Sequence, residues 1–282
     1  MEGRTAIVTG AAYGLGVFFA RTMAEAGADV VLAARSVDKL EEIAPLIEAF
    51  GVKSLVQECD VTDLAAVAQT VENAWGTFGQ VDVLVNNAGV VAEVGVMPER
   101  LPDELFTSTM ATNANGLFTF CREVGARQLA DGEGGSIINV ASIAGLVAQS
   151  HFPAAYQASK AAVINLTWNL ASSWAKRGVR VNALCPGWFP SEMTPMKRVG
   201  VDGELDAALL FMAPDASSFM TGSTMVIDDG VTSTMGGTDY SPDMFAAMVE
   251  VAVEFGTAMV TLSEMSPAWA GDPLGVSDGS IG

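Results

Sequence analysis

The sequence predicts an α/β protein with a doubly wound, mostly parallel sheet of seven strands and helices on both of its faces. Short apolar runs rich in β-branched residues alternate along the chain with longer segments of helical periodicity. This alternation is typical of parallel strands joined by helical crossovers. A glycine-rich turn follows the first apolar run and precedes the first helical segment, as it does where such sheets bind nucleotides. Each expected element is justified below in chain order.

The N-terminal part predicts four strands separated by three helices. The strands are expected at residues 5–9, 30–34, 54–57 and 81–85, and the helices at 15–26, at 38–50 and from 63 onward. Gly27 is well placed to stop the first helix, and Pro45 should kink or restart the second. Thr62 is the expected cap of the third. The apolar residues of that helix share one face, namely Leu64, Val67, Val71, Ala74 and Phe78.

The C-terminal part predicts three more strands and a late helix. Helices are expected at 103–130, 154–177 and 203–213, with strands at 136–140, 179–184 and 223–227. A further helix is predicted at about 242–262, because Ser241-Pro242-Asp243 is a favourable start and apolar residues then recur at helical spacing. The only plausible boundary lies near Gly236, dividing a main domain (1–234) from a C-terminal extension (235–282).

Charge argues against two classes of partner. The 282 residues include 33 acidic and 14 basic side chains, for a net charge of −19, whereas nucleic acids and anionic membranes require a basic surface. Arg198 is the last basic residue, so residues 1–198 carry −6 and residues 199–282 carry −13. The apolar stretch 244–262 contains Glu250 and Glu254, which disfavour a membrane span. We therefore expect no nucleic acid and no membrane as partners.

The cysteines indicate a reducing environment. Cys59, Cys121 and Cys185 are odd in number and widely spaced, which fits buried thiols better than disulfides or a metal site. Met1 is followed almost directly by the first strand, without a basic segment and an apolar run of signal-peptide length. The sequence predicts a cytoplasmic protein without a metal.

The glycine-rich turn is the first motif that carries chemistry. Gly10, Gly14 and Gly16 lie between the first strand and the first helix, with the spacing GxxxGxG. Glycines there allow the backbone to turn sharply and to approach a pyrophosphate, which lies on the positive end of the helix. A glycine-rich turn alone is a weak signal, because many tight strand-to-helix turns contain glycine.

The second motif is Tyr156 followed by Lys160. Four residues apart on a helix, the two side chains project from the same face. A nearby ammonium group stabilises a phenolate and lowers the pKa of a tyrosine toward neutrality, which makes a metal-free general acid and base. This spacing by itself is common by chance.

Together the two motifs resemble those of the short-chain dehydrogenase/reductase family, and the resemblance covers nearly all of residues 3–234. The further family landmarks occur in order along the chain: Cys59-Asp60-Val61, Asn86-Asn87-Ala88-Gly89, Asn113, Ser142 and Pro186-Gly187. The resemblance implies a Rossmann-like, NAD(P)-binding catalytic domain over residues 1–234.

The resemblance also implies catalytic roles. Ser142 would hydrogen-bond the substrate oxygen, Tyr156 would exchange its proton, and Lys160 would hold the nicotinamide ribose and lower the Tyr156 pKa. Asn113 would bind, through its helix backbone, a water that links Lys160 to solvent. Ser142 precedes Tyr156 by 14 residues, one more than is common in the family, so we expect the loop at 148–153 to bulge at the pocket mouth.

The family motifs place a set of residues around the cofactor. They are Gly10, Tyr13, Gly14, Leu15, Gly16, Arg35, Ser36, Asp60, Val61, Asn86, Ala88, Gly89, Tyr156, Lys160, Pro186, Gly187, Phe189 and Ser191. Family members that prefer NAD usually carry an acidic residue where this chain has Ala34. Arg35 and Ser36 follow instead and suit a 2′-phosphate, so NADP(H) is favoured. NAD(H) stays open, because an arginine also stacks on adenine.

The substrate pocket is expected to be largely apolar. Its predicted members are Ser142, His151, Phe152, Tyr156, Trp188, Met193 and Met196. The segment that covers the substrate in the family is short here. An apolar mouth suits a hydrophobic or aromatic ketone, and the chain is predicted to be an alcohol dehydrogenase or carbonyl reductase. The alternative is a sugar or polyol dehydrogenase, because residues 186–194 resemble gluconate-type members.

Further expectations concern the oligomeric state, the C-terminal extension and the functional class of the protein. The family commonly forms dimers and tetramers through its two long helices, so a homodimer or homotetramer is expected. The extension at 235–282 is expected to cover the active site or to dock on a neighbouring subunit; an ordinary helix packed on its own domain is the alternative. In the other functional class, the chain is a catalytically idle nucleotide-sensing protein, which the intact set Asn113, Ser142, Tyr156 and Lys160 argues against.

Overall fold

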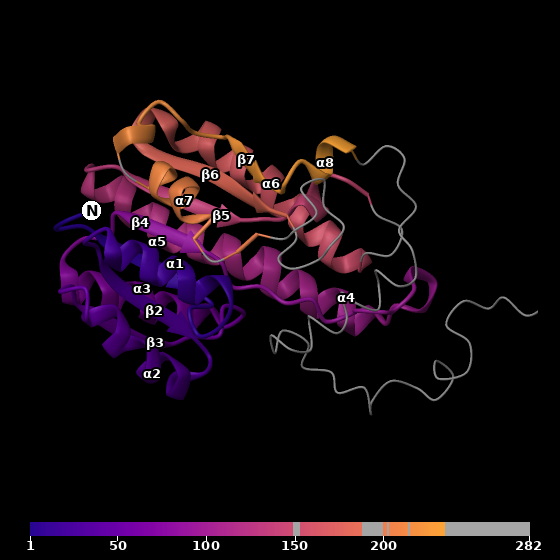
Figure 1. Ribbon diagram of the computed structural model, residues 1–282, viewed down its shortest axis with the longest axis horizontal. Coiled ribbons are helices and arrows are strands. Elements are labelled where there is room, and N and C mark those ends of the chain that lie inside the picture. The colour runs from indigo at the N-terminus through magenta and orange to yellow at the C-terminus, as the bar shows by residue number, and fades with distance from the viewer. Residues whose placement is uncertain (149–152, 188–199, 202, 214, 235–282) are drawn as a thin grey trace, which may run out of the picture.

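The computed structural model describes residues 1–148, 153–187, 200–201, 203–213 and 215–234. Within these residues, seven strands form one sheet in the order β3-β2-β1-β4-β5-β6-β7 (Figure 1). Every neighbouring pair is parallel. The strands are β1 (Thr5–Thr9), β2 (Asp29–Ala34), β3 (Ser54–Glu58), β4 (Val83–Asn86), β5 (Gly135–Val140), β6 (Val179–Pro186) and β7 (Thr224–Ile227). The predicted doubly wound α/β fold is confirmed.

The direction of winding changes beside the first strand. Ile7 of β1 pairs with Val31 of β2 on one side and with Leu84 of β4 on the other. Because the chain winds outward in both directions from this point, the loops after β1 and β4 diverge and leave a crevice at their carboxyl ends. The glycine-rich turn lies at this crevice.

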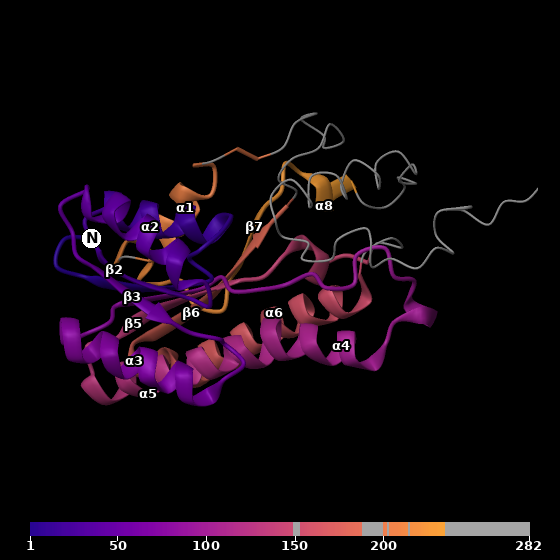
Figure 2. The ribbon, with the colours of Figure 1, turned by 90° about the horizontal axis from the view of Figure 1, so that it is seen from below.

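Helices cover both faces of the sheet (Figure 2). One face is covered by α1 (Leu15–Glu25), α2 (Val37–Glu48) and α7 (Asp206–Met212), and the other by α3 (Leu64–Phe78), α5 (Leu117–Asp131) and α6 (Ala154–Trp174). Two further helices are α4 (Asp103–Met110), which packs against α6, and the short α8 (Val231–Thr234). The helix α2 continues through Pro45, so the predicted restart is not found.

The two sides of the sheet bury separate apolar clusters. Phe19, Met23 and Leu40 pack against one face, whereas Phe120 and Val163 pack against the other, and all five are fully buried. Because both faces are covered, the central strands consist almost entirely of buried residues rather than alternating ones. This packing holds the strand ends, and hence the loops that follow them, in fixed positions.

A π-helical segment interrupts the long helix predicted at 103–130. Residues Ala111–Gly116 (η2) join α4 to α5 with wider hydrogen-bonded turns. At Gly116 a Cβ atom would lie 2.7 Å from Val61 Cγ2, so the helix passes close to the loop after β3. Such π turns are found mostly where function requires a local change of helix geometry.

The N-cap residue of α3 is not the predicted one. The carboxylate of Asp63 accepts hydrogen bonds from the backbone N–H groups of Ala65 (2.8 Å) and Ala66 (3.2 Å) and therefore caps α3. The predicted cap, Thr62, instead donates its hydroxyl to Asp60 Oδ1 (2.7 Å). A carboxylate one position closer to the helix reaches its free amide groups better.

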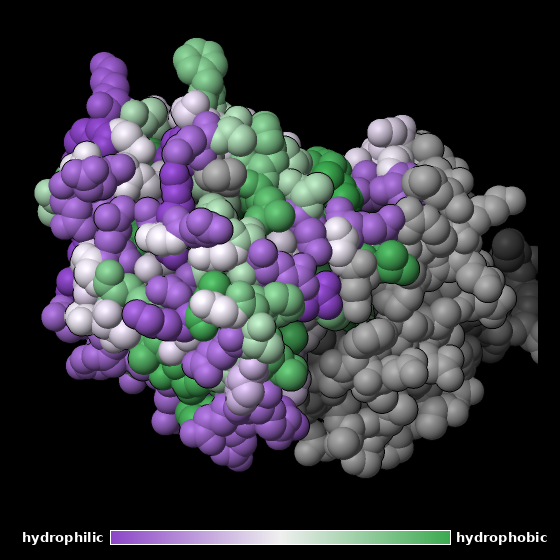
Figure 3. Space-filling view, turned by 60° about the vertical axis from the view of Figure 1, so that its left-hand side comes forward, coloured by the Kyte–Doolittle hydropathy of each residue, from purple (hydrophilic) through white to green (hydrophobic). Residues whose placement is uncertain are grey.

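Figure 3 shows hydrophilic residues interspersed with smaller groups of hydrophobic ones over the described part of one face. None of the helices in the described ranges has the length and apolar character needed to cross a bilayer.

Cys59, Cys121 and Cys185 are buried free thiols, as predicted. The predicted helix at 242–262 and the extension at 235–282 lie outside the described residues.

Candidate active site

The glycine-rich turn has the backbone geometry that a close approach requires. Gly10 has φ +66°, and a Cβ atom there would lie 2.9 Å from the Cα of Ala88 in the loop after β4. Gly14 has φ +53°, and the position of its missing Cβ faces open space. At Gly16 a Cβ atom would clash with the carbonyl group of Gly10. The turn is thus closely packed at Gly10 and Gly16 and open to its surroundings at Gly14.

The loop after β4 is bonded directly to this turn. The backbone N–H groups of Asn87 and Ala88 both donate to Thr9 Oγ1 (3.0 Å each), and Asn87 Nδ2 donates to the Thr9 carbonyl (3.1 Å). Asn87 was not among the predicted site residues, although it lies within the same four-residue motif. It fixes the spacing between the two loops that border the crevice.

The Asn86 side chain is buried in the interior. It is 2% exposed, and its Nδ2 donates to Asn139 Oδ1 (3.0 Å) and to Cys121 Sγ (3.1 Å). The side chain therefore lies beneath the loop, where it links β4 to β5 and α5, and not at the surface of the crevice. The Asn86 side chain supports the loop, and the predicted cofactor contact of this residue stays a prediction.

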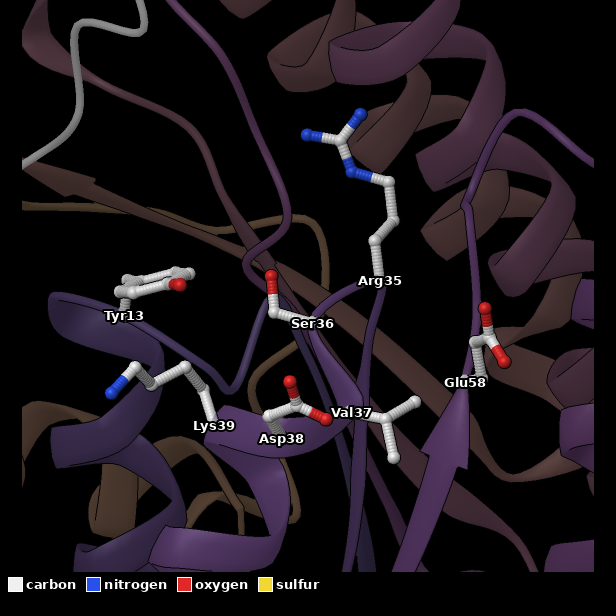
Figure 4. Close-up of a pocket in the computed structure, with 7 residues that line it drawn as sticks. All are labelled: Tyr13, Arg35, Ser36, Val37, Asp38, Lys39 and Glu58. Carbon is white, nitrogen blue, oxygen red and sulfur yellow. The ribbon is translucent and has the colours of Figure 1, made fainter.

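A shallow cavity of about 500 Å³ lies beyond the end of β2 (Figure 4). Arg35 and Ser36 line it, together with Tyr13, Val37, Asp38, Lys39 and Glu58. Ser36 is the N-cap residue of α2, but its side chain bonds none of the amide groups of that helix. Arg35 is exposed, and among the ion pairs of the described residues it takes part in none. An unpaired guanidinium and an uncapped helix N-terminus suit an anionic ligand.

Sequence reasoning missed three charged residues of this cavity, namely Asp38, Lys39 and Glu58. Lys39 lies near Tyr13 in Figure 4 and pairs with Glu42 at 2.8 Å. Glu58 pairs in the sheet with Ala34, which brings its carboxylate to the side of the cavity below Arg35. Only the register of β2 and β3 places Glu58 here.

Asp60 and Val61 form the loop that follows β3. Burial would raise the pKa of Asp60, but hydrogen bonds from the N–H and hydroxyl groups of Thr62, together with the charge of Arg35, outweigh this and lower that pKa. Asp60 is therefore held as a carboxylate. Val61 is buried against Gly116 of the π segment.

These observations fit a dinucleotide better than a metal. The turn at Gly10–Gly16 leaves open space in front of the α1 N-terminus, and Gly14, its N-cap residue, supplies no side-chain cap. A pyrophosphate would satisfy amide groups of this kind. In the described ranges no group of three or more His, Cys, Asp or Glu side chains is arranged to hold a metal ion.

The second half of the site lies where β5 ends and α6 begins. Ser142 is the N-cap of the short 3-10 turn Ile143–Gly145, and its Oγ accepts a hydrogen bond from the Ala144 N–H (3.1 Å). Tyr156 lies in the first turn of α6, and its side chain is hydrogen-bonded to that of Ser142. The two hydroxyl groups predicted to act together are thus in contact.

Lys160 lies one helical turn after Tyr156 and is 4% exposed. Its Nζ lies 5.6 Å from the centroid of the Tyr156 ring and donates to the Val140 carbonyl (2.9 Å) at the end of β5. Burial lowers the pKa of Lys160 from its ordinary 10.5 to about 8. Gly89 lies beside this ammonium group, and a Cβ atom there would be in ordinary van der Waals contact with Nζ at 3.5 Å.

The pKa of Tyr156 differs from the prediction. Burial raises it, and the hydrogen bond with Ser142 opposes that rise without cancelling it. The nearby Cys185 and Glu93 raise it further. Lys160 is not among the groups that lower this pKa; its Nζ atom is directed to the Val140 carbonyl. Tyr156 is thus held in its protonated form.

Asn113 lies in the π segment and is fully buried. Its Oδ1 accepts from the Val90 N–H (2.7 Å), and its Nδ2 donates to the Val90 carbonyl (2.9 Å) and to Ser159 Oγ (3.0 Å). The side chain therefore joins the loop after β4 to α6. The predicted role of the Asn113 backbone stays a prediction.

The end of β6 completes the described part of the site. The Cys185 thiol is hydrogen-bonded to the Ser142 backbone, and burial raises its pKa to about 11, so it stays protonated. Pro186 ends the strand, and at Gly187 a Cβ atom would lie 2.5 Å from the Cα of Asp228. The remaining predicted residues lie outside the described ranges: His151, Phe152, Trp188, Phe189, Ser191, Met193 and Met196.

Comparison with known proteins identifies relatives that match most of this chain. A family model described as short chain dehydrogenase matches residues 4–200. The gluconate 5-dehydrogenase of Gluconobacter oxydans is 33% identical over 83% of this chain and 97% of its own length. A 3beta-hydroxysteroid dehydrogenase of Eggerthella lenta is 35% identical over 82% of this chain and 95% of its own.

Solved structures give a similar result. The crystal structure of an NADPH-dependent 3-quinuclidinone reductase from Rhodotorula rubra has a TM-score of 0.77 and 33% identity. It covers 83% of this chain and 93% of its own. The relatives thus span the seven-stranded unit almost completely.

Proposed function

The chain belongs to the short-chain dehydrogenase family, and we propose that it interconverts a ketone and a secondary alcohol. The observation that carries the proposal is the hydrogen bond between the Ser142 and Tyr156 side chains, with the buried Lys160 beside the tyrosine ring. A nicotinamide dinucleotide, when bound, supplies or accepts the hydride. Family membership supports an oxidoreductase that uses NAD or NADP.

In this proposal the protein itself orients the substrate oxygen and moves one proton. Ser142 Oγ hydrogen-bonds the carbonyl oxygen, and Tyr156 gives its phenolic proton to that oxygen during reduction. In the reverse direction Tyr156 takes the proton from the alcohol. Lys160 would hold the ribose of the cofactor.

The protonation of Tyr156 favours reduction at neutral pH. Burial and the neighbouring Cys185 and Glu93 raise its pKa, so the group carries the proton that the product alcohol requires. A phenolate, which oxidation of the alcohol requires, forms only at higher pH. We therefore expect oxidation to increase as the pH rises through the Tyr156 pKa.

Of the two cofactors, we favour NADP(H). The unpaired Arg35 and the uncapped start of α2 at Ser36 would bind a 2′-phosphate, and Arg35 offers two parallel donors for it. Asp38 and Glu58 line the same cavity and would repel that phosphate in part. NAD(H) stays open for this reason.

For the substrate, we propose a hydrophobic or aromatic ketone. The support is the apolar character of the predicted pocket residues and the likeness to hydroxysteroid and 3-quinuclidinone enzymes. The alternative is a sugar or polyol, supported by the likeness to a gluconate 5-dehydrogenase. A panel of aryl ketones, steroids and sugar acids, assayed with NADPH and NADH separately, distinguishes the two.

The decisive variant is Tyr156→Phe, which removes only the phenolic hydroxyl. If the chain is an enzyme, turnover should fall by about 100-fold or more, because the proton donor is lost, while the affinity for cofactor is kept. Cofactor affinity is measured by fluorescence titration and turnover by NADPH absorbance.

A matched control is Ser173→Ala, which removes an exposed hydroxyl group at the end of α6 that lies away from Tyr156. It should leave kcat unchanged. A catalytically idle sensor would show no turnover in the wild type or in either variant, while cofactor binding stays intact. That result would contradict the proposed enzyme and support a nucleotide-binding protein.

A further inference from the structure

Glu93 is a carboxylate in the protein interior. It lies in the loop between β4 and the 3-10 turn Pro98–Arg100 and is 0% exposed. Removing a charged group from water costs several kcal/mol unless it is compensated by hydrogen bonds or opposite charge. Its position needs a reason, because an apolar residue would fill the same space at lower cost.

Both carboxylate oxygens have partners on helices of the active site. Glu93 Oε2 accepts from Thr109 Oγ1 of α4 (2.9 Å), and Oε1 accepts from the backbone N–H of Tyr156 in α6 (2.7 Å). The carboxylate therefore connects three parts of the chain: the loop after β4, α4 and the start of α6. The amide that it binds belongs to the residue proposed as the proton donor.

The bond to Tyr156 satisfies a helix end that has no cap of its own. The helix α6 begins at Ala154, and its N-cap residue is Pro153, which supplies no side-chain hydrogen bond. The first amide groups of a helix lack partners within it, and the positive end of the helix dipole attracts a carboxylate. Glu93 thus caps α6 from a distant part of the sequence at its third residue.

This contact fixes the base of the Tyr156 side chain. The hydroxyl end is held by Ser142, and the ring lies beside Lys160. With the backbone amide held by Glu93, the phenol is fixed at both ends. A displacement of about 1 Å in a reacting group costs about 100-fold in rate.

We propose that Glu93 is a positioning residue that acts through the Tyr156 backbone amide to hold the phenol against Ser142 and the substrate oxygen. The inference rests on the proposed function, in which Tyr156 is the acid and base. It adds a residue that lies outside the serine, tyrosine and lysine set.

The charge of Glu93 has a second, measurable consequence. Among the described residues, the groups that influence Tyr156 are Ser142 from the 3-10 turn, Cys185 from β6, Lys160 from α6 itself and Glu93 from the loop. Glu93 is the anion among them, and its repulsion of a phenolate raises the Tyr156 pKa. Removing the charge should lower that pKa, and the alkaline limb of the reduction should move to lower pH.

Two variants separate the hydrogen bonds from the charge. Glu93→Ala removes both, and we expect kcat to fall by about 100-fold while the affinity for NADPH is kept. Glu93→Gln keeps an oxygen for the Tyr156 amide and an NH₂ group for Thr109. It should restore most of the lost kcat and still shift the pH limb downward.

The matched control is Glu104→Gln, which removes an exposed carboxylate from α4. It should change neither kcat nor the pH limb. The proposal is overturned if Glu93→Ala keeps kcat, or if cofactor affinity falls together with kcat, because Glu93 would then act only in folding. If Glu93→Ala does not fold, the pH limb of Glu93→Gln decides, and an unshifted limb overturns the proposal.

A spectroscopic titration keeps this test independent of the proposed function. The chain contains three tyrosines, so the ultraviolet absorbance of the Tyr156 phenolate is obtained as the difference from Tyr156→Phe. If the wild-type chain reduces no ketone, the proposed function fails. A lower Tyr156 pKa in Glu93→Gln would still support the contact, and an unchanged one would overturn it.

Discussion

At the scale of single residues, burial shifts the pKa values of the tyrosine and the lysine of the site in opposite directions. Burial lowers the pKa of Lys160 to about 8, and it raises the pKa of Tyr156. Both shifts disfavour the charged form, because a poorly solvated interior penalises charge of either sign. Tyr156 therefore carries its proton at neutral pH, whereas Lys160, with a pKa of about 8, is still mostly charged there.

Arg35 provides a residue-scale prediction on cofactor choice. In Arg35→Ser, KM for NADPH should rise by about 10- to 100-fold, because a charge-assisted hydrogen bond contributes about 1.5–3 kcal/mol. KM for NADH should change little. Steady-state kinetics with both cofactors measure the difference.

The control for Arg35 is Lys39→Gln, which removes a cation from the same cavity. Lys39 is already paired with Glu42, so its loss should have the smaller effect on NADPH. Equal changes for NADPH and NADH in Arg35→Ser would contradict a contact with the 2′-phosphate and would favour stacking on adenine.

At the scale of elements, the helix ends determine where the functional side chains lie. The start of α6 has no cap within its own sequence and is held by Glu93. The π segment η2 directs Asn113 onto both polar groups of Val90. In each case a loop after β4 is joined to a helix, so the site is assembled by contacts between elements.

The cap of α3 supplies an element-scale prediction. Asp63→Ala should lower the free energy of unfolding by about 1 kcal/mol, because two amide groups of the first turn lose their acceptor. The change is measured by urea denaturation. In the comparison variant Thr62→Val the cap stays intact, so the loss should be smaller. A larger loss in Thr62→Val would show that threonine, not aspartate, stabilises the helix.

At the scale of the whole molecule, the seven-stranded unit and the C-terminal residues differ in two ways. The relatives match 82–83% of this chain and 95–97% of their own lengths, so this chain is longer than they are. The bases end at Arg198, and the residues beyond it carry the larger part of the negative charge. We propose that residues 1–234 form the catalytic domain and that residues 235–282 are an extension to it.

Deletion of residues 237–282 tests the extension. If it covers an active site, KM for the ketone should rise or fall while cofactor affinity stays the same. If it docks on a neighbouring subunit, the mass in solution should change from that of the homodimer or homotetramer expected for the full chain. Light scattering and kinetics on both proteins measure this. Unchanged kinetics and mass would contradict both roles.

Much of the fold was predictable from local patterns. The apolar runs and helical periodicities predict all seven strands, within a few residues of their bounds. Tyr156 and Lys160 were predicted to share a helix face, which the structure confirms. By contrast, Glu93 carries no local signal, since an acidic residue in a loop is ordinarily exposed to solvent. Glu58 ends β3, and only its pairing with Ala34 brings it to the cavity.

The sequence by itself determined the order of strands and helices, the glycine-rich turn and the residues of the proposed chemistry, because each depends on neighbours within a few positions. Only the tertiary structure decided which groups surround Tyr156 and how its pKa shifts. Those contacts join residues that are distant in sequence, such as Glu93 and Tyr156. Burial, which sets the cost of charge there, is a property of the packed molecule.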